Sequence, residues 1–438
     1  MILSFIFKNQ LLSTFAARGM AAGGTFLLSY VLATFVDLKE FGAFMLCLSI
    51  MIGIQVFTSL GTDRATLKYM GIATANDNRR EVKWIYHRGF WVNMAASLVV
   101  STLLFFWAAE IAALLFTNVE KGAHALRITA LLSPLYSIIY LCNFILKGWG
   151  KANVSCLFEI GSISIILSLF IVGISLFSNV VLTASYLMAL LGSLLVLYLV
   201  IGLWAVMRVY GSSGLSDDRK ISFSRGFYQS LPDFLLVGII FYYIQWGASV
   251  VLGVFHSEEQ VAIFSLGLRL AMIIGFILTV YDSILGPKFS RLYHENNHTE
   301  LRRLAKKSTL QMSLFSALPA FIFLLWPEWI LSFFGNDYQG AAGVLRVLVL
   351  AQVINVFTGS VVLLLLMVDR QRLARNLLLL SVVVGGGVAL ILTPFYGAMG
   401  AALSLLVCLT VHNVLAVYVV KRDLGFLMMD WRGAYVRH

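Results

Sequence analysis

Long runs of apolar residues alternate with short polar segments along almost the whole chain. Each run is long enough to cross a bilayer as an α-helix, which requires about 20 residues. The pattern predicts twelve membrane-spanning helices, at residues 11–35, 40–61, 89–116, 124–147, 153–176, 180–207, 228–254, 259–286, 308–334, 341–368, 373–393 and 397–420. We therefore expect an all-α integral membrane protein.

Composition agrees with this pattern. Of the 438 residues, 60% are hydrophobic and only 12% are charged, whereas about 25% of residues are charged in an average soluble protein. We therefore do not expect a water-soluble fold. The four cysteines all lie inside apolar runs without the spacing of a metal or redox site, so they are expected to be packing residues: Cys47, Cys142, Cys156 and Cys408.

The basic residues follow the predicted topology. In this arrangement 26 of the 32 Lys and Arg residues lie on the side of the N-terminus, while Lys39 and Lys121 lie in loops on the opposite side. Because short cytoplasmic loops hold the positive charge, both termini are predicted to be cytoplasmic. The net charge of +11 is then explained by topology and anionic lipid headgroups, and no nucleic-acid partner is expected.

The chain contains an internal repeat. Sliding the sequence over itself until Trp107 meets Trp326 also brings Arg127 onto Arg346, without a gap between them. An even number of helices in each repeat gives both halves the same orientation, which is typical of transporters with parallel repeats. We predict a six-helix N-terminal lobe at 1–210, a cytoplasmic linker at 211–227 and a six-helix C-terminal lobe at 228–438.

Ionisable residues inside membrane helices are costly and usually face an interior or a water-filled cavity. Arg18 lies well inside the first span and Arg269 lies about halfway along the eighth. We favour a functional role for both, although Arg18 can also snorkel to the cytoplasmic headgroups.

Each of four further charged residues has two possible roles. Arg127 and Arg346 form either a gate or substrate contact, or interfacial anchors repeated by duplication. Glu159 and Asp282 bind a coupling ion, or each pairs with a nearby basic residue.

Motifs of catalysis are absent from the sequence. No G-x-x-x-x-G-K-[ST] phosphate loop and no H-E-x-x-H metal motif occurs, and the longest segments between spans, near 62–88 and 287–307, are short and basic. We expect a protein that is not an enzyme, with no catalytic residues, no cofactor and no structural or catalytic metal.

Several segments resemble the polysaccharide-export flippases. They are Glu40-Phe41-Gly42-Ala43-Phe44, Ser59-Leu60-Gly61-Thr62-Asp63, Pro287-Lys288-Phe289-Ser290-Arg291, Phe334-Gly335-Asn336-Asp337-Tyr338 and Tyr396-Gly397-Ala398-Met399-Gly400. The chain is similar to the O-antigen and exopolysaccharide repeat-unit (Wzx-type) flippases of the multidrug/oligosaccharidyl-lipid/polysaccharide (MOP) superfamily. In one departure from many of those relatives, an Asp-Arg pair in the seventh helix is replaced here by Ala248 and Ser249.

The resemblance implies a MATE-like fold, with two six-helix lobes around a central cavity, that works by alternating access in the bacterial inner membrane. It implies as substrate an oligosaccharide linked to undecaprenyl diphosphate, with H⁺ or Na⁺ as coupling ion and a glycan polymerase and export machinery as partners. In this reading Arg18 and Arg269 bind the diphosphate, since guanidinium offers a fork of donors to phosphate oxygens.

Three alternatives remain open. A cation-coupled exporter of drugs or metabolites often relies on an acid deep in the first helix, where this chain has Arg18. A non-transporting scaffold of a glycan-assembly complex does not explain Arg269 at mid-membrane. A glycan ligase or polymerase would need an enlarged external loop, which the sequence lacks.

Overall fold

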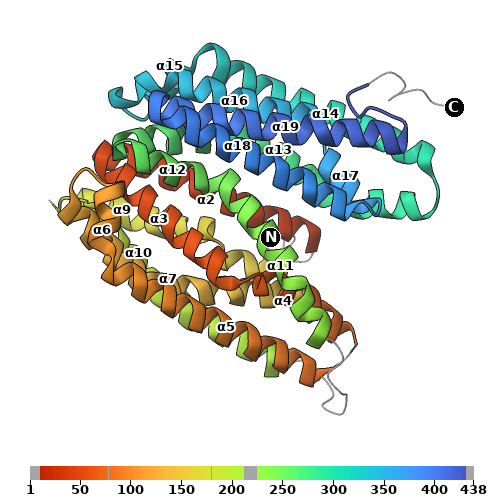
Figure 1. Ribbon diagram of the computed structural model, residues 1–438, viewed down its shortest axis with the longest axis horizontal. Coiled ribbons are helices and arrows are strands. Elements are labelled where there is room, and N and C mark those ends of the chain that lie inside the picture. Colours follow the sequence, from red (N-terminus) through yellow and green to blue (C-terminus); the bar gives the residue numbers. More distant parts are fainter. Residues whose placement is uncertain (1–9, 77, 179, 212–223, 431–438) are drawn as a thin grey trace. The chain divides into compact units, whose positions relative to one another are not determined.

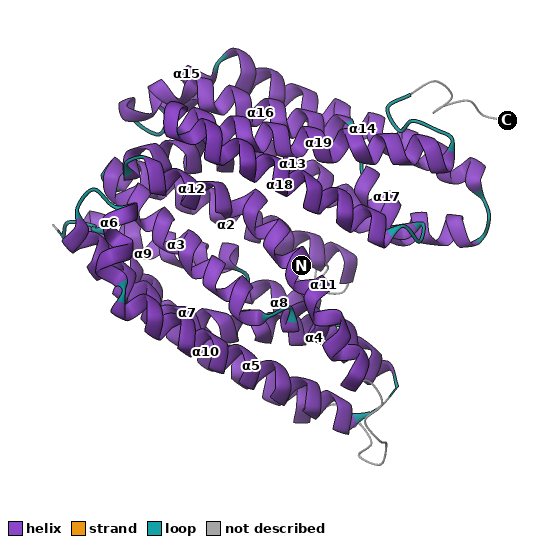
Figure 2. Ribbon diagram, in the orientation of Figure 1, coloured by secondary structure: helices purple, strands orange, loops and turns teal. Residues whose placement is uncertain are grey.

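Every regular element in the described part of the chain is a helix (Figure 2). The computed structural model describes residues 10–76, 78–178, 180–211 and 224–430. Within them, eleven helices are long and apolar enough to cross a membrane, and they overlap the second to twelfth predicted spans. Helix α2 (Gln10–Phe35) covers the first predicted span, and its apolar part is Gly23–Phe35. The predicted all-α membrane fold is confirmed.

The chain forms two compact units, unit 1 at Met1–Ala262 and unit 2 at Ile263–His438, which divide inside helix α13 (Glu258–His294). The predicted lobes divide earlier, at 211–227, and most of that linker lies outside the described residues. The seventh span falls in unit 1 because it packs closely on α3: Gly253 leaves room for Leu46. The lobes defined by the repeat stay a prediction.

Unit 1 is built around one central helix, α7 (Figure 1). Its elements are α2, α3 (Leu38–Ser59), α4 (Thr62–Ala75), α5 (Arg79–Phe106), α6 (Ala108–Leu115), α7 (Val119–Gly148), α8 (Ala152–Ser155), η1 (Cys156–Phe158), α9 (Ile160–Phe177), α10 (Ala184–Gly211), α11 (Ser224–Tyr242), η2 (Tyr243–Gly247) and α12 (Ala248–Phe255). Helix α7 contacts α3, α4, α5, α6 and α10. Thr129 and Ser133 are therefore buried, and each donates a hydrogen bond to the carbonyl oxygen one turn earlier, at 2.8 Å.

Unit 2 is arranged around α19, which contacts α16, α17 and α18 (Figure 1). Its elements after α13 are α14 (His298–Leu325), α15 (Pro327–Ser332), η3 (Asn336–Ala341), α16 (Ala342–Phe357), α17 (Val361–Met367), α18 (Gln371–Tyr396) and α19 (Ala398–Leu424). Phe289 of α13, Leu364 of α17 and Met428 beyond α19 are buried in one hydrophobic cluster. The segment after α19 is thereby held against the unit.

Two spans begin well before their predicted starts, because asparagine caps begin the helices inside basic segments. The Asn78 side chain accepts from the Glu81 N–H at 3.2 Å, and the Asn297 side chain accepts from the Glu300 N–H at 3.1 Å. Such caps satisfy N–H groups that a helix start leaves without a partner. The same offset that superposes Trp107 on Trp326 superposes Asn78 on Asn297, so the caps follow the repeat read from the sequence.

The tenth predicted span, 341–368, is not continuous. It is divided into α16 and α17, and residues 358–360 between them are not helical. Gly359 has a left-handed backbone, with φ of 77°. Hydropathy does not detect such a break, because the flanking residues are apolar on both sides.

A glycine contact joins α2 and α9. A Cβ atom on Gly24 would collide with the carbonyl oxygen of Gly161 and with the side chain of Ile165, whereas one on Gly23 would meet nothing within 4 Å. Small residues allow membrane helices to approach this closely.

We predict that Gly24→Val destabilises the protein, because the added methyl groups meet backbone atoms that cannot rotate away. The expected cost is about 1–3 kcal/mol, the range of overpacking substitutions. Thermal unfolding of the detergent-solubilised protein measures it, with Gly23→Val as the matched control. Equal effects of the two substitutions would contradict the predicted contact.

Candidate functional site

Unit 1 holds a buried carboxylate where α3 meets α4. The chain turns there through Leu60 and Gly61, which have φ of 49° and 79°. Asp63 follows in the first turn of α4, is 1% exposed, and pairs with Arg64 at 3.2 Å between Oδ2 and Nη1. A buried charge is stable only when it is paired and hydrogen-bonded. Arg64 therefore provides the countercharge of Asp63.

Burial raises the pKa of the Asp63 carboxyl above its ordinary value, while the charge of Arg64 acts in the opposite direction. The backbone N–H of Arg64 also donates to Asp63, at 2.7 Å. Asp63 was not among the predicted site residues, because it follows a span and resembles a loop acid. One signal was available: the offset of the repeat superposes Asp63 on Asp282.

Glu159 pairs with a basic residue, which is the second of its two predicted readings. Its Oε1 lies 2.7 Å from Nζ of Lys147, and both side chains are partly exposed. Lys147 Nζ also lies 5.3 Å from the centre of the Phe144 ring, and Arg64 Cζ lies 6.0 Å from the same ring. The carboxylate is thus neutralised within unit 1. A role of Glu159 in ion coupling stays a prediction.

In unit 2, Arg269 lies in the membrane-spanning part of α13 and is 7% exposed. Its Nη1 contacts Sδ of Met272 at 3.6 Å. A guanidinium at this depth is costly and marks a functional candidate. The cavity role predicted for Arg269, with its contact to a substrate, stays a prediction.

Asp282, also on α13, lies beside the break between α16 and α17. Its carboxylate accepts a hydrogen bond from the Ser360 hydroxyl. In the described part of the chain it forms no ion pair with Lys, Arg or His. Within the described residues Asp282 is therefore not paired with a basic side chain, and its predicted role in ion coupling stays a prediction.

Arg127 and Arg346 occupy equivalent repeat positions but have different partners. Arg127 Cζ lies 6.0 Å from the centre of the Phe105 ring. Arg346 donates from Nε to the carbonyl oxygen of Leu324 at 3.1 Å and pairs with Glu328 at 2.9 Å, where both charged side chains are about half exposed. These contacts suit anchors that join neighbouring helices. A gating role stays a prediction.

Arg18 lies on α2, but its side chain lies outside the described residues. Its predicted role in binding substrate therefore stays a prediction.

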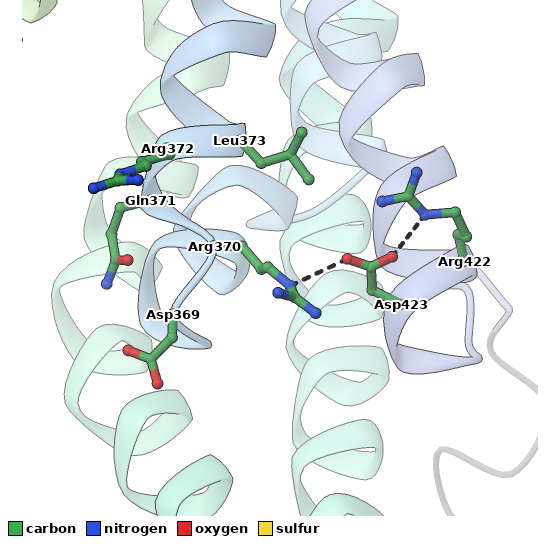
Figure 3. Close-up of a pocket in the computed structure, with 7 residues that line it drawn as sticks. All are labelled: Asp369, Arg370, Gln371, Arg372, Leu373, Arg422 and Asp423. Carbon is green, nitrogen blue, oxygen red and sulfur yellow. Dashed lines mark hydrogen bonds and ion pairs between the residues drawn. The ribbon is translucent and has the colours of Figure 1, made fainter.

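Unit 2 also contains a hollow of about 580 Å³ where α17 connects to α18, beside the end of α19. It is lined by Asp369, Arg370, Gln371, Arg372, Leu373, Arg422 and Asp423. Figure 3 shows the side chains of Arg370 and Arg422 meeting at Asp423, with nitrogen–oxygen distances of 3.2 and 2.7 Å. None of the predicted site residues lines this hollow. Asp423 neutralises part of its positive charge, so we do not assign it to substrate.

The sequence matches a family model described as polysaccharide biosynthesis protein over residues 8–293, more than half of the chain. The chain belongs to this family. A second family model, MatE, matches residues 235–385. This polysaccharide biosynthesis protein has the helices of a multi-pass membrane protein, and the predicted resemblance to the polysaccharide-export family is confirmed at that level.

Solved structures share the fold. An inward-facing multidrug resistance MATE family transporter matches with a TM-score of 0.74 at 13% sequence identity, and the match covers 94% of this chain and 98% of the transporter. The lipid II flippase MurJ, in an inward closed conformation, matches with a TM-score of 0.66 at 12% sequence identity, and the match covers 93% of this chain and 87% of MurJ. The MATE multidrug transporter DinF-BH has a TM-score of 0.61 at 16% identity, with 95% of both chains covered. No curated protein matches the sequence. The predicted MATE-like fold is confirmed.

We predict that Arg64→Met costs about 3–5 kcal/mol of stability at neutral pH, because it leaves the buried Asp63 carboxylate without its countercharge. Without the charge of Arg64, the pKa of Asp63 in the folded variant lies still further above its value in the unfolded chain. The folded state therefore binds a proton more tightly, and stability is lost as pH rises through the raised pKa. Thermal unfolding should show a larger deficit at about pH 8 than at about pH 5.

The matched control is Arg88→Met, because Arg88 is an exposed arginine of the same unit. It should show no pH-dependent deficit. A deficit in Arg64→Met that is equal at both pH values would contradict the assignment of the countercharge.

The exposed Arg346–Glu328 pair should contribute little. Surface ion pairs contribute about 0–1 kcal/mol, so a double-mutant cycle with Arg346→Ala and Glu328→Ala should give a coupling energy in that range. A coupling energy above about 2 kcal/mol would show that the pair is held as tightly as a buried one.

Proposed function

We propose that this protein is a flippase for an oligosaccharide repeat unit linked to undecaprenyl diphosphate. It moves the unit from the cytoplasmic to the periplasmic leaflet of the bacterial inner membrane by alternating access, for the synthesis of O-antigen or exopolysaccharide. The observation that carries this proposal is the family match, polysaccharide biosynthesis protein, over residues 8–293. The fold shared with a lipid II flippase supports it.

The chemistry of such a substrate fits the charged residues of the chain. A polyprenyl tail can remain in lipid while the diphosphate head crosses the hydrocarbon layer, so the protein must offer positive charge inside the membrane. Arg269 is a buried guanidinium in a spanning helix, and Arg18 lies on α2, before its apolar part. We assign the diphosphate to these two residues, because guanidinium binds phosphate oxygens through paired hydrogen bonds.

The membrane orientation and the partners belong to the same proposal. Both termini are cytoplasmic, in keeping with the distribution of Lys and Arg. A glycan polymerase and the export machinery receive the product on the periplasmic side. Transport is driven by H⁺ or Na⁺, with Glu159 and Asp282 as candidate ion-coupling residues.

A second candidate function is the export of small molecules coupled to a cation. The MatE match at 235–385 and the shared fold with multidrug transporters favour it. Loss of an exporter would raise drug sensitivity and leave surface glycan unchanged. A non-transporting scaffold would in turn tolerate the loss of Arg269.

Gene deletion in the host should abolish the surface glycan, and lipid-linked intermediates should accumulate in the cytoplasmic leaflet. Wild-type protein should restore the glycan, whereas Arg18→Ala and Arg269→Ala should restore about tenfold less. A hydrogen bond to a charged group is worth about 1.5–3 kcal/mol, and about 1.4 kcal/mol corresponds to a factor of ten. The measurement is glycan yield at equal membrane abundance.

Two further variants sharpen this experiment. Arg269→Lys retains the charge without the fork of donors, so its yield should lie between those of wild type and Arg269→Ala. Arg372→Ala removes an exposed arginine of unit 2 and should restore full yield. Unchanged glycan after deletion, in a host without a second flippase, would overturn the proposal in favour of the exporter.

A further inference from the structure

The hollow where α17 connects to α18 lies at one membrane surface. It is lined by the first residues of α18 and by the last turn of α19, and both helices are long and apolar enough to cross a membrane. The two helices also pack against each other. Because a spanning helix ends where the hydrocarbon ends, the hollow lies at the depth of the lipid headgroups. The distribution of Lys and Arg predicts that this surface is cytoplasmic.

Asp423 holds two guanidinium groups in this hollow. Its Oδ2 atom lies 3.2 Å from Nε of Arg370, and its Oδ1 atom lies 2.7 Å from Nε of Arg422. In the described part of the chain, Asp423 is the only ion-pair partner of either arginine. Both arginine side chains are about half exposed, whereas the side chain of Asp423 is 13% exposed. The Nη groups of both arginines can therefore bind an acceptor that enters the hollow.

The charge of this group selects the kind of anion. Two positive arginines and one negative aspartate leave a net charge of +1. The other two charged residues of the lining, Arg372 and Asp369, have opposite signs, and Figure 3 shows both side chains pointing away from Asp423. A phosphodiester carries one negative charge and accepts paired hydrogen bonds from guanidinium. It balances the group, whereas a diphosphate would leave an excess of negative charge.

The start of α18 adds hydrogen-bond donors to the hollow. Gln371, Arg372 and Leu373 form its first turn, no side chain caps it, and no acceptor for their N–H groups is found among the described residues. Such N–H groups, together with the positive end of the helix dipole, attract an anion. They supplement the two arginines and do not select between anions by themselves.

Apolar side chains lead from the hollow into the hydrocarbon region. On α19, Val414 and Tyr418 are 56% and 61% exposed, and with Arg422 they follow a spacing of four residues along one face of the helix. On α18, Leu373 lines the hollow, and Leu380, which is 49% exposed, follows two turns later. A ligand that places a phosphate at Arg422 can therefore lay hydrocarbon chains along the same face.

We propose that this hollow binds one anionic phospholipid. Its phosphodiester lies between Arg370 and Arg422, and its acyl chains lie along the exposed faces of α18 and α19. Basic pockets between spanning helices are suited to lipid headgroups. A soluble phosphate offers the same charge but no chains to cover the apolar surface, so the lipid is the better fit. The site does not depend on the proposed flippase function, because neither arginine is assigned to the substrate.

The test is the thermal stability of the purified full-length protein in mixed micelles at constant ionic strength. Phosphatidylglycerol supplies the phosphodiester with its chains, phosphatidylcholine supplies the chains with a neutral headgroup, and inorganic phosphate supplies the charge alone. A ligand that binds only the folded state raises stability with its concentration. We expect a saturable rise in the unfolding midpoint of about 2–4 °C with phosphatidylglycerol only, and native mass spectrometry should detect a single tightly bound lipid.

Three variants test the two arginines. Arg370→Gln and Arg422→Gln should each raise the phosphatidylglycerol concentration at half effect by about tenfold, because a hydrogen bond to a charged group is lost. Arg422→Lys keeps the charge without the fork of donors. Its half-effect concentration should therefore lie between those of wild type and Arg422→Gln.

The matched control is Arg372→Gln. It removes the same charge from the same hollow, but from a side chain that points away from Asp423, and it should retain the full effect of phosphatidylglycerol. Each variant is compared with and without lipid, so any change that the substitution makes to stability itself cancels.

The proposal is overturned if phosphatidylcholine stabilises the protein as much as phosphatidylglycerol, or if inorganic phosphate gives the whole effect. It is also overturned if Arg372→Gln weakens the lipid effect as much as Arg422→Gln, or if Arg422→Lys matches wild type, since the lipid would then respond to surface charge in general. None of these readouts involves glycan. A phosphatidylglycerol effect in a protein whose loss leaves glycan unchanged would reject the flippase and keep the site, and lost glycan without a lipid effect would do the reverse.

Discussion

The hydrocarbon core of a membrane contains no water to hydrogen-bond a free amide or a charged side chain, and the architecture of this chain follows from that constraint. Helices satisfy their own backbone, and the buried hydroxyls of Thr129 and Ser133 in α7 donate to carbonyl oxygens one turn earlier. The glycine contact between α2 and α9 lets the two backbones approach closely without a polar side chain between them. Buried charged side chains cannot satisfy this constraint through helix hydrogen bonds, so their partners distinguish one part of the fold from another.

The two units balance a buried carboxylate differently at the positions that the sequence offset superposes, Asp63 and Asp282. In unit 1 a carboxylate at the start of α4 is neutralised by the next residue, so Asp63 and Arg64 form a permanent pair. In unit 2 the equivalent Asp282 faces a hydroxyl and a broken helix instead. The two positions that the predicted repeat superposes thus hold carboxylates with different partners. One half becomes a fixed support, while the other retains an unbalanced charge.

Much of the architecture was predictable because hydropathy and charge act over whole segments. Apolar runs indicated the spans, and self-comparison of the sequence indicated the repeat that the Asn78 and Asn297 caps also follow. Site chemistry was less predictable. Arg269 was found because a charge in an apolar run is conspicuous, whereas Asp63 follows a span and was missed although it is 1% exposed. Burial depends on the helices packed around a residue, which local sequence does not specify.

By itself, the sequence determined the class of this protein: an all-α membrane protein with its charges sorted by topology and a family resemblance carried by motifs at helix ends. Those properties are local or additive along the chain, so a linear reading is enough. Only the tertiary structure decided which charges are balanced. Glu159 meets Lys147 and Asp63 meets Arg64, but Asp282 meets a break in a helix far along the chain, at Ser360. Electrostatic balance depends on distances in space, and those arise only when the helices pack.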